Sequence, residues 1–237
     1  MLSIDKMLLG CQELNIDLTE TQIEQFKKFK ELLKEWNEKI NLTAIKEDDE
    51  IDIKHFLDSL TLLQTKYFNG HQKVIDIGTG GGFPGVPLKI MKPELEITLF
   101  DSLKKRLNYL DIVIEELELS QIETLHGRAE DFAKEVKREK YDRVVSRAVA
   151  NLSTLSEYCL PYVKVGGYFI AMKGPIVEEE IDTAKKAIRI LGGKIVEKID
   201  VGIPCSDLRH NLVIIKKIKP TPKKYPRQAG KPKRNPL

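Results

Sequence analysis

Apolar residues recur at helical spacing in the first 70 residues of the chain. One run of positions spaced by three and four residues comprises Ile23, Phe26, Phe29, Leu33, Trp36 and Ile40. Thr19 and Gln22 precede it with the spacing of a capping box, and Asn41 is a plausible helix end. A second run comprises Phe56, Leu57, Leu60 and Leu63. We therefore predict an N-terminal helical extension over residues 1–70.

From Lys73 onward the pattern changes to short apolar runs that alternate with amphipathic segments. The runs predict strands at residues 74–77, 96–100, 122–125, 141–146, 167–172, 194–201 and 211–218. The segments between them predict helices at residues 103–117, 129–136, 152–160 and 177–191. Strands that alternate with helices indicate a mostly parallel sheet covered on both faces. The last two strands are joined only by a loop, which predicts an antiparallel C-terminal hairpin.

The prediction is thus a single α/β domain of Rossmann-like type over residues 71–219, followed by a basic tail over residues 220–237. From Lys219 to the end there are seven Lys and Arg and no Asp or Glu. Residues 1–218 then hold 32 basic and 36 acidic side chains, a net charge of −4. Five prolines argue against helix or sheet in the tail, so we expect it to be flexible and suited to a phosphate backbone.

Composition narrows the class of protein further. Hydrophobic residues make up 41% and charged residues 32% of the 237 positions, as in soluble globular proteins. We find no run of about 18 apolar residues and no signal peptide, so we expect a cytoplasmic protein without membrane contact. The three cysteines are far apart and the four histidines are scattered, so we expect neither disulfides nor a metal site. We also expect a monomer.

Residues 76–85, Asp-Ile-Gly-Thr-Gly-Gly-Gly-Phe-Pro-Gly, follow the first predicted strand and open a helix. Ligands bind at this place in open α/β sheets, because glycines let the backbone approach them closely. Gly80, Gly82 and Gly85 match the dinucleotide pattern G-x-G-x-x-G, and Asp101 lies about twenty residues further on, as a ribose-binding acid would. A nicotinamide-dependent oxidoreductase therefore stays open as an alternative.

S-adenosylmethionine makes different demands, because it carries a sulfonium cation and no phosphate. Asp76, directly before the glycines, suits the cationic amino-acid end of this methyl donor. Asp101 can accept hydrogen bonds from both ribose hydroxyls. The order Asp76, Gly78, Gly80 and then Asp101 after the next strand favours the methyl donor, as does the antiparallel hairpin. We therefore predict a class I S-adenosylmethionine-dependent methyltransferase.

The glycine loop closely resembles that of the bacterial 16S ribosomal RNA guanine-N7 methyltransferase family, also called glucose-inhibited division protein B. Further motifs that resemble the family occur in the right order at residues 41–45, 55–59, 101–106, 127–130, 146–150 and 225–232. The resemblance implies methyl transfer to N7 of one guanine in the RNA of the small ribosomal subunit. It also implies that Gly78, Phe83, Ala129, Glu130 and Arg147 bind the donor, with Arg147 directed to the donor or to RNA.

Guanine N7 has a free lone pair and releases no proton when it attacks, so we predict no catalytic base and no covalent nucleophile. Pro204-Cys205 resembles the thiolate element of cytosine-C5 enzymes, but a small loop residue is the simpler interpretation. A non-catalytic RNA-binding protein is a third alternative. For RNA contact we predict the following basic residues: Arg147, Lys223, Lys224, Arg227, Lys231, Lys233 and Arg234. We expect deletion of residues 220–237 to weaken RNA binding and to leave donor affinity close to wild type.

Overall fold

The protein is described by a computed structural model that covers residues 4–133, 137–147 and 150–237. Its centre is a seven-stranded sheet in the order β3-β2-β1-β4-β5-β7-β6. The strands are β1 (Lys73–Ile77), β2 (Glu96–Asp101), β3 (Ile122–His126), β4 (Tyr141–Ser146), β5 (Val163–Lys173), β6 (Gly193–Gly202) and β7 (Arg209–Lys217). Strands β1 to β5 run parallel, whereas β7 is antiparallel to both β5 and β6. The predicted mixed sheet with a C-terminal hairpin is confirmed.

The N-terminal helices form largely where the apolar spacing placed them. Helix α2 (Glu20–Ile40) begins with the predicted capping box of Thr19 and Gln22, and it ends at Asn41, which has a left-handed φ of 52°. Helix α1 (Asp5–Glu13) precedes it and lies within the predicted helical extension, although no apolar run marked it separately. The second apolar run forms one irregular helix made of α3 (Asp48–Ile51), a π-helical segment η1 (Asp52–Leu57), α4 (Asp58–Leu60) and a 3-10 segment η2 (Thr61–Gln64).

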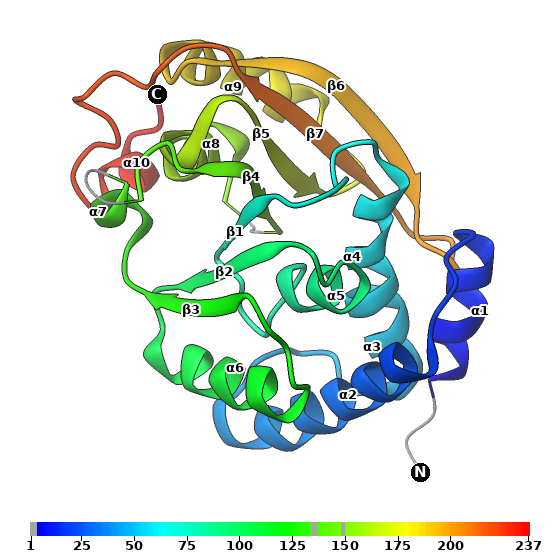
Figure 1. The fold of residues 1–237 in the computed structure, drawn as a ribbon. Helices are drawn as coiled ribbons and strands as arrows, with labels where there is room; N and C mark the ends of the chain where they lie inside the picture. The colour runs from blue at the N-terminus through cyan, green and yellow to red at the C-terminus, as the bar shows by residue number, and fades with distance from the viewer. Residues whose placement is uncertain (1–3, 134–136, 148–149) are drawn as a thin grey trace.

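Helices cover both faces of the sheet (Figure 1). Helices α5 (Gly85–Met91) and α6 (Lys104–Glu116) lie with the N-terminal helices on one face. Helices α8 (Leu152–Cys159) and α9 (Glu178–Ile190) lie on the other. Phe26, Phe29 and Leu33 belong to the same buried cluster as Val74 and Leu99 of the sheet. The N-terminal extension therefore shares the core of the sheet domain, because the apolar face of α2 packs on α5 and α6.

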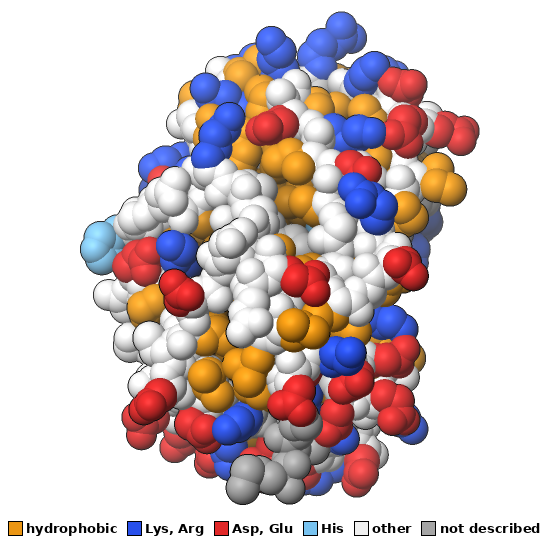
Figure 2. Space-filling model, turned by 90° about the vertical axis from the view of Figure 1, so that its right-hand side faces the viewer, with side chains coloured by type: hydrophobic (Ala, Val, Ile, Leu, Met, Phe, Trp, Pro, Cys, Tyr) orange, Lys and Arg blue, Asp and Glu red, His pale blue; other side chains and the backbone are white. Residues whose placement is uncertain are grey.

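Short helical segments complete the chain. Helix α7 (Ala129–Phe132) begins where a helix was predicted, and residues 134–136 of that prediction lie outside the described residues. A 3-10 segment, η3 (Leu160–Tyr162), leads from α8 into β5. Within the described ranges no helix is long and apolar enough to cross a membrane. On the face drawn in Figure 2, acidic side chains gather over the N-terminal helices at its lower end.

The expectation of a flexible tail without helix is corrected by the structure. Residues 231–234 form a short helix, α10 (Lys231–Arg234), which lies beside α8 (Figure 1). Tyr225 and Pro232 are buried. Pro232 stands in the first turn of α10, where a missing N–H breaks no helical hydrogen bond. The buried partners of the tail come from distant parts of the chain, so the local pattern of prolines and lysines did not reveal them.

Candidate functional site

The glycine loop is built around the side chain of Asp76, the fourth residue of β1. One carboxylate oxygen of Asp76 accepts hydrogen bonds from Thr79 Oγ1 at 2.7 Å and from the backbone N–H of Gly85 at 2.9 Å. The side chain is fully buried, and burial raises its pKa to about 7 despite these bonds. Gly78, Gly80 and Gly82 all have positive φ angles, between 59° and 98°, a conformation that favours glycine. Asp76 thus holds the shape of the loop.

Asp101, at the end of β2, joins the loop to the start of α6. Its two carboxylate oxygens accept hydrogen bonds from the N–H of Gly80 at 3.0 Å and from the N–H of Leu103 at 2.9 Å. Arg106 approaches the same carboxylate at 3.5 Å. Each carboxylate oxygen can accept more than one hydrogen bond. Asp101 can therefore accept further hydrogen bonds, and it lines a cavity.

That cavity, the first cavity, has a volume of about 480 Å³, within the usual range for small-molecule sites. It lies at the carboxyl ends of β1, β2 and β3. Four of the predicted donor-binding residues line it: Gly78, Asp101, Ala129 and Glu130. Glu130 is buried, and one of its carboxylate oxygens accepts a hydrogen bond from the N–H of Gly230 in the tail at 2.9 Å. The structure thus brings half of the predicted donor site together.

The other four predicted donor-binding residues do not line the first cavity. Asp76 and Gly80 lie behind it and hold its glycine wall through the hydrogen bonds described above. Phe83 is buried and faces the N-terminal helices, with its ring stacked on His55 at 4.5 Å. The guanidinium of Arg147 lies 5.1 Å from the centre of the Phe83 ring and also contacts His55.

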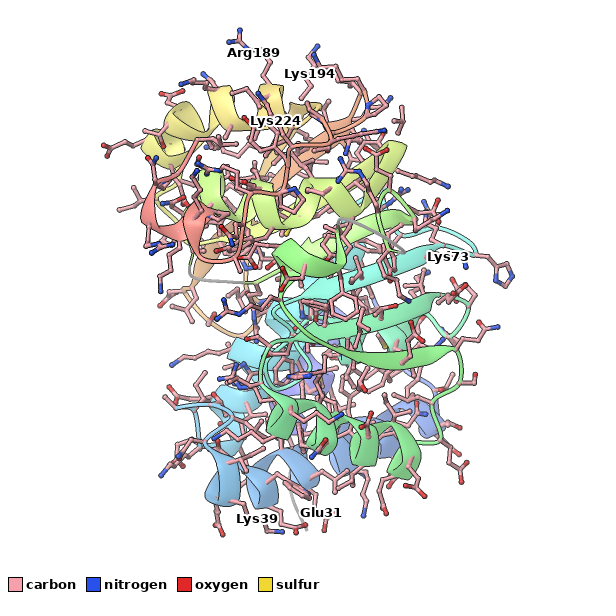
Figure 3. All side chains as sticks on the ribbon, turned by 90° about the vertical axis from the view of Figure 1, so that its left-hand side faces the viewer. Glu31, Lys39, Lys73, Arg189, Lys194 and Lys224 are labelled. Atoms are coloured by element: carbon pink, nitrogen blue, oxygen red, sulfur yellow. The ribbon has the colours of Figure 1, made fainter. Side chains whose placement is uncertain are left out.

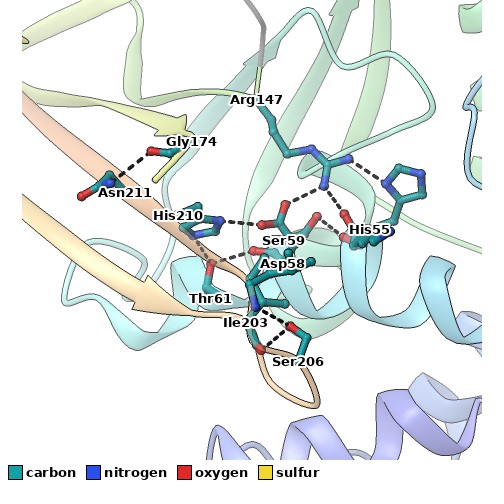
Figure 4. A network of polar contacts seen from close by, with 12 residues as sticks. His55, Asp58, Ser59, Thr61, Arg147, Gly174, Ile203, Ser206, His210 and Asn211 are labelled. Atoms are coloured by element: carbon teal, nitrogen blue, oxygen red, sulfur yellow. Dashed lines mark hydrogen bonds and ion pairs between the residues drawn. The ribbon is translucent and has the colours of Figure 1, made fainter. Parts of the chain in front are cut away.

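Arg147 belongs to a polar network at the carboxyl ends of β4 and β5 (Figure 4). Its guanidinium donates to Asp58 Oδ2 at 2.7 Å, to the carbonyl of Lys54 at 3.0 Å and to His55 Nδ1 at 3.1 Å. The other oxygen of Asp58 bonds to Nδ1 of His210 on β7. This network borders a second cavity of about 400 Å³, lined by Asp58, Arg147, Met172, Lys173, Gly174, Glu180 and His210. Residues 148 and 149 of the 146–150 motif lie outside the described residues.

The two histidines of the network have different hydrogen-bond roles. Arg147 can only donate, so Nδ1 of His55 is an acceptor and its Nε2–H donates to Thr43 Oγ1 at 2.8 Å. Burial and the charge of Arg147 lower the pKa of His55 to about 3, which keeps the ring neutral. In His210, both ring nitrogens face oxygens: Asp58 Oδ1 and Thr61 Oγ1, whose own proton goes to the carbonyl of Asp58.

The network predicts how acid affects stability. Burial alone would raise the pKa of Asp58, but the hydrogen bond with His210 and the positive charge of Arg147 outweigh it and lower that pKa below 3.8. A carboxylate whose pKa is lowered on folding stabilises the protein above its unfolded pKa, and this stability is lost as the pH falls through the folded pKa. We expect the loss of unfolding free energy in Asp58→Asn to be largest above pH ~5 and to shrink below pH ~4.

Urea denaturation of the wild type and Asp58→Asn between pH ~2.5 and pH 7 measures this difference. Asp200→Asn is the control, since it removes an exposed carboxylate paired with Arg209. A difference between wild type and Asp58→Asn that stayed constant over the whole range would contradict the lowered pKa.

Sequence reasoning missed the roles of His55, Asp58 and His210. The 55–59 motif was noticed, but no role was given to its residues. A signal was present, because His55 and Asp58 are three residues apart and share one helical face. His210 had no such signal, since it meets Asp58 from 152 residues away.

Cys205 does not have the surroundings of a nucleophile. It lies between β6 and β7, where its thiol contacts the carbonyl of Lys6 and the carboxylate of Glu13. Burial and the negative charge of Glu13 raise its pKa, which disfavours the thiolate. Among the residues that the structure describes, no group of three or more His, Cys, Asp or Glu could hold a metal.

The predicted RNA-binding residues of the tail fall into two groups. Five are exposed: Lys223, Lys224, Lys231, Lys233 and Arg234. Figure 3 shows Lys224 in the upper part of the molecule, in the region of α9 and β6. Arg227 differs, because its guanidinium is paired with the fully buried Glu157 of α8 at 2.6 Å. Lys233 is exposed and also lines the first cavity.

Comparisons with solved structures support the fold. TYW2 of M. jannaschii, solved in complex with AdoMet, superposes with a TM-score of 0.53 at 14% identity, over 68% of this chain and 77% of that chain. TrmN from Thermus thermophilus superposes with a TM-score of 0.53 at 16% identity, over 68% of this chain and 48% of that chain. At such identities the likeness concerns the fold alone, which is the Rossmann-like fold predicted above.

Sequence comparisons identify the family. The family model described as rRNA small subunit methyltransferase G matches residues 22–204. The ribosomal RNA small subunit methyltransferase G of Clostridium novyi is 57% identical over 98% of this chain and 96% of its own length. The protein of the same name from Alkaliphilus oremlandii is also 57% identical, over 96% of each chain. The chain therefore belongs to the rRNA small subunit methyltransferase G family.

Proposed function

We propose that this chain transfers a methyl group from S-adenosylmethionine to N7 of one guanine in the 16S RNA of the small ribosomal subunit. The observation that carries the proposal is the first cavity, where Asp101 and Glu130 present carboxylates from the ends of neighbouring strands. Family membership gives the reaction and the RNA class. We further propose that the protein acts as a monomer in the cytoplasm.

The residues of the first cavity fit the methyl donor. Asp101 would accept hydrogen bonds from the ribose hydroxyls, since it retains free acceptor sites. Ala129 and Glu130, on the far side of the cavity, would then meet the adenine. S-adenosylmethionine supplies an electrophilic methyl group on a sulfonium sulfur. Gly78 and the loop behind it would hold the amino-acid end.

The loop geometry argues against the alternative of a nicotinamide dinucleotide. A pyrophosphate is held by free backbone N–H groups at the start of a helix. Here the N–H of Gly80 donates to Asp101 and the N–H of Gly82 donates to the carbonyl of Thr79. The N–H of Gly85, at the start of α5, donates to the carboxylate of Asp76. These three N–H groups already have acceptors, so they are not free to bind a pyrophosphate. At the start of α5 the acceptor is the buried carboxylate of Asp76.

The second cavity suits the acceptor guanine. It lies beside the first along the same edge of the sheet, because β4 and β5 follow β1 in the strand order. Lys173 connects the two cavities: its ammonium donates to the carbonyl of Ala150, which lines the first cavity, and pairs with Glu180, which lines the second. We assign Arg147 to the RNA side for this reason, since it borders the second cavity and not the first.

The chain's contribution to the reaction is positioning. Guanine N7 offers a lone pair and gives up no proton, so neither His55 nor His210 has to act as a base. Well-oriented reactants can recover about 7–11 kcal/mol of a barrier. The purine becomes positively charged in the reaction, and the carboxylates that border the second cavity, those of Asp58 and Glu180, can stabilise that charge. The exposed basic residues of the tail would contact RNA phosphates.

Methyl transfer from radiolabelled S-adenosylmethionine tests the proposal. The acceptors are free small-subunit RNA and small subunits from a strain that lacks this gene. We expect label at N7 of a single guanine, with the productive acceptor showing whether RNA or the subunit is the substrate. Binding of NADH in place of S-adenosylhomocysteine in a fluorescence titration would favour the oxidoreductase instead. Binding of RNA and of S-adenosylhomocysteine without any methyl transfer would favour a non-catalytic RNA-binding protein.

A further inference from the structure

The C-terminal tail reaches the first cavity. Gly230 and Lys233 line the cavity together with residues from β1, β2 and the segment after β3. The N–H of Gly230 donates to one carboxylate oxygen of Glu130 at 2.9 Å. Gly230 has a φ of 79°, the left-handed conformation that glycine adopts without strain. One side of the cavity is therefore made by a segment that follows Glu130 by 100 residues in the sequence.

The tail is held in this place by buried contacts with α8. The guanidinium of Arg227 makes three hydrogen bonds to both oxygens of Glu157, at 2.6 to 3.1 Å, and its backbone N–H makes a fourth at 2.7 Å. Glu157 is fully buried, so the pair excludes water on one side. Thr154 Oγ1 donates to the carbonyl of Pro232 at 3.1 Å. A charge-assisted, multiply bonded pair of this kind is a strong anchor.

A second anchor fixes the tail upstream of Arg227. Arg138 donates to the carbonyls of Thr221 at 2.6 Å and Tyr225 at 2.9 Å. Thr221 and Tyr225 are themselves buried. The tail thus consists of a first half that packs on the domain core and a second half, from Arg227 onward, that turns to the cavity.

We propose that residues 227–233 are part of the donor-binding site, which rests on the function proposed above. Arg227 anchors the segment, Gly230 fixes the carboxylate of Glu130, and Lys233 completes the cavity wall. Glu130 has one oxygen bonded to Gly230, so its other oxygen is held ready for the donor in a fixed orientation. Without the tail, the side chain of Glu130 loses its hydrogen bond to Gly230. Donor binding must then also fix the orientation of this side chain, which weakens the affinity. Donor affinity should then depend on the tail, the opposite of what the basic composition alone suggested.

Two single substitutions separate this role from the general effect of positive charge. Arg227→Gln and Lys223→Gln each remove one positive charge from the tail, but only Arg227 anchors it, since Lys223 is exposed. In calorimetric titrations with S-adenosylhomocysteine, we expect Arg227→Gln to weaken binding about tenfold and Lys223→Gln to leave it within about twofold. In steady-state assays, KM for S-adenosylmethionine should rise in Arg227→Gln, while kcat at saturating donor and RNA stays near wild type.

A shortened chain distinguishes weaker donor binding from a folding defect. Arg227→Gln leaves the buried Glu157 without its partner, which can destabilise the protein by itself. A chain that ends at Pro226 and carries Glu157→Gln keeps the Thr221 and Tyr225 anchors and leaves no unpaired carboxylate on α8. Thermal unfolding shows whether it is folded at the assay temperature, and we expect the same tenfold weaker donor binding.

Unchanged affinity for S-adenosylhomocysteine in both the Arg227→Gln variant and the shortened chain would overturn the inference, even if RNA affinity fell. The proposed function is judged separately, by methyl transfer in the wild type. If the wild type is active and the variants bind donor normally, the proposed function is supported and the role of the tail in donor binding is rejected. If the wild type binds donor but labels no RNA, the proposed RNA methylation is rejected. The role of the tail is then still decided by the titrations with S-adenosylhomocysteine. Wild type that binds no S-adenosylhomocysteine overturns both.

Discussion

Replacement of Asp101 by asparagine is expected to weaken binding of S-adenosylhomocysteine by about a hundredfold or more. The carboxylate accepts hydrogen bonds from Gly80 and Leu103 and lines the first cavity. An asparagine amide has one acceptor oxygen, so it cannot support the loop, the start of α6 and the ribose at once. Hydrogen bonds to a charged group contribute about 1.5–3 kcal/mol each, so the loss of two accounts for the expected factor. Isothermal titration of the purified variant measures it.

Asp111→Asn is the matched control for this experiment. Asp111 is an exposed carboxylate of α6, the helix that begins after Asp101, and it bonds only to Thr124 Oγ1 among the described contacts. We expect its donor affinity to equal that of the wild type. If Asp101→Asn also bound within about threefold of wild type, the first cavity would not be the ribose site.

Replacement of Arg147 by glutamine is expected to separate donor binding from methyl transfer. Arg147 links Asp58, His55 and the carbonyl of Lys54 at the edge of the second cavity, and it does not line the first. Its loss should therefore leave affinity for S-adenosylhomocysteine within about twofold. The acceptor guanine would no longer be held in line with the methyl group, and a displacement of about 1 Å can lower a rate about a hundredfold. Single-turnover methyl transfer with saturating donor gives this rate.

Arg143→Gln provides the comparison for Arg147. Arg143 belongs to β4, the strand that ends directly before Arg147, but its guanidinium lies over the ring of Tyr168 and donates to the carbonyl of Tyr67. It lines neither cavity. We expect its substitution to reduce stability without changing the rate of the folded protein. Equal losses of donor affinity and of methyl-transfer rate in Arg147→Gln would indicate that Arg147 binds the donor and not the RNA.

The elements of the fold could be predicted because their signals are local. The five parallel strands appear as short apolar runs, and the capping box at Thr19 marks the start of α2. The position of Asp101 could be predicted for the same reason: carboxyl ends of parallel strands share one edge of a sheet. Helix α1 lies within the predicted helical extension, but no apolar run singled it out, because its buried positions are few: Met7, Gly10 and Cys11.

The parts of the site that could not be predicted depend on contacts between distant segments. Phe83 stands in the glycine loop, but its ring turns away from the first cavity to stack on His55. Glu157 appears in the sequence as an ordinary helical carboxylate, yet it is fully buried against Arg227, 70 residues later. No periodicity or motif indicates such a pair, because each residue is common on protein surfaces.

The position of α2 has a consequence for how the chain folds as it is synthesised. Its apolar face packs on α5 and α6: Phe29 meets Phe83, Trp36 meets Tyr109, and Gln25 donates to the carbonyl of Leu117. The most distant of these partners, Leu117, leaves the ribosome 92 residues after Gln25 does. In proteins, most of the stability of a helix comes from the packing of its apolar face. The aromatic residues of α2 therefore remain unburied in the nascent chain until the sequence through Leu117 has emerged.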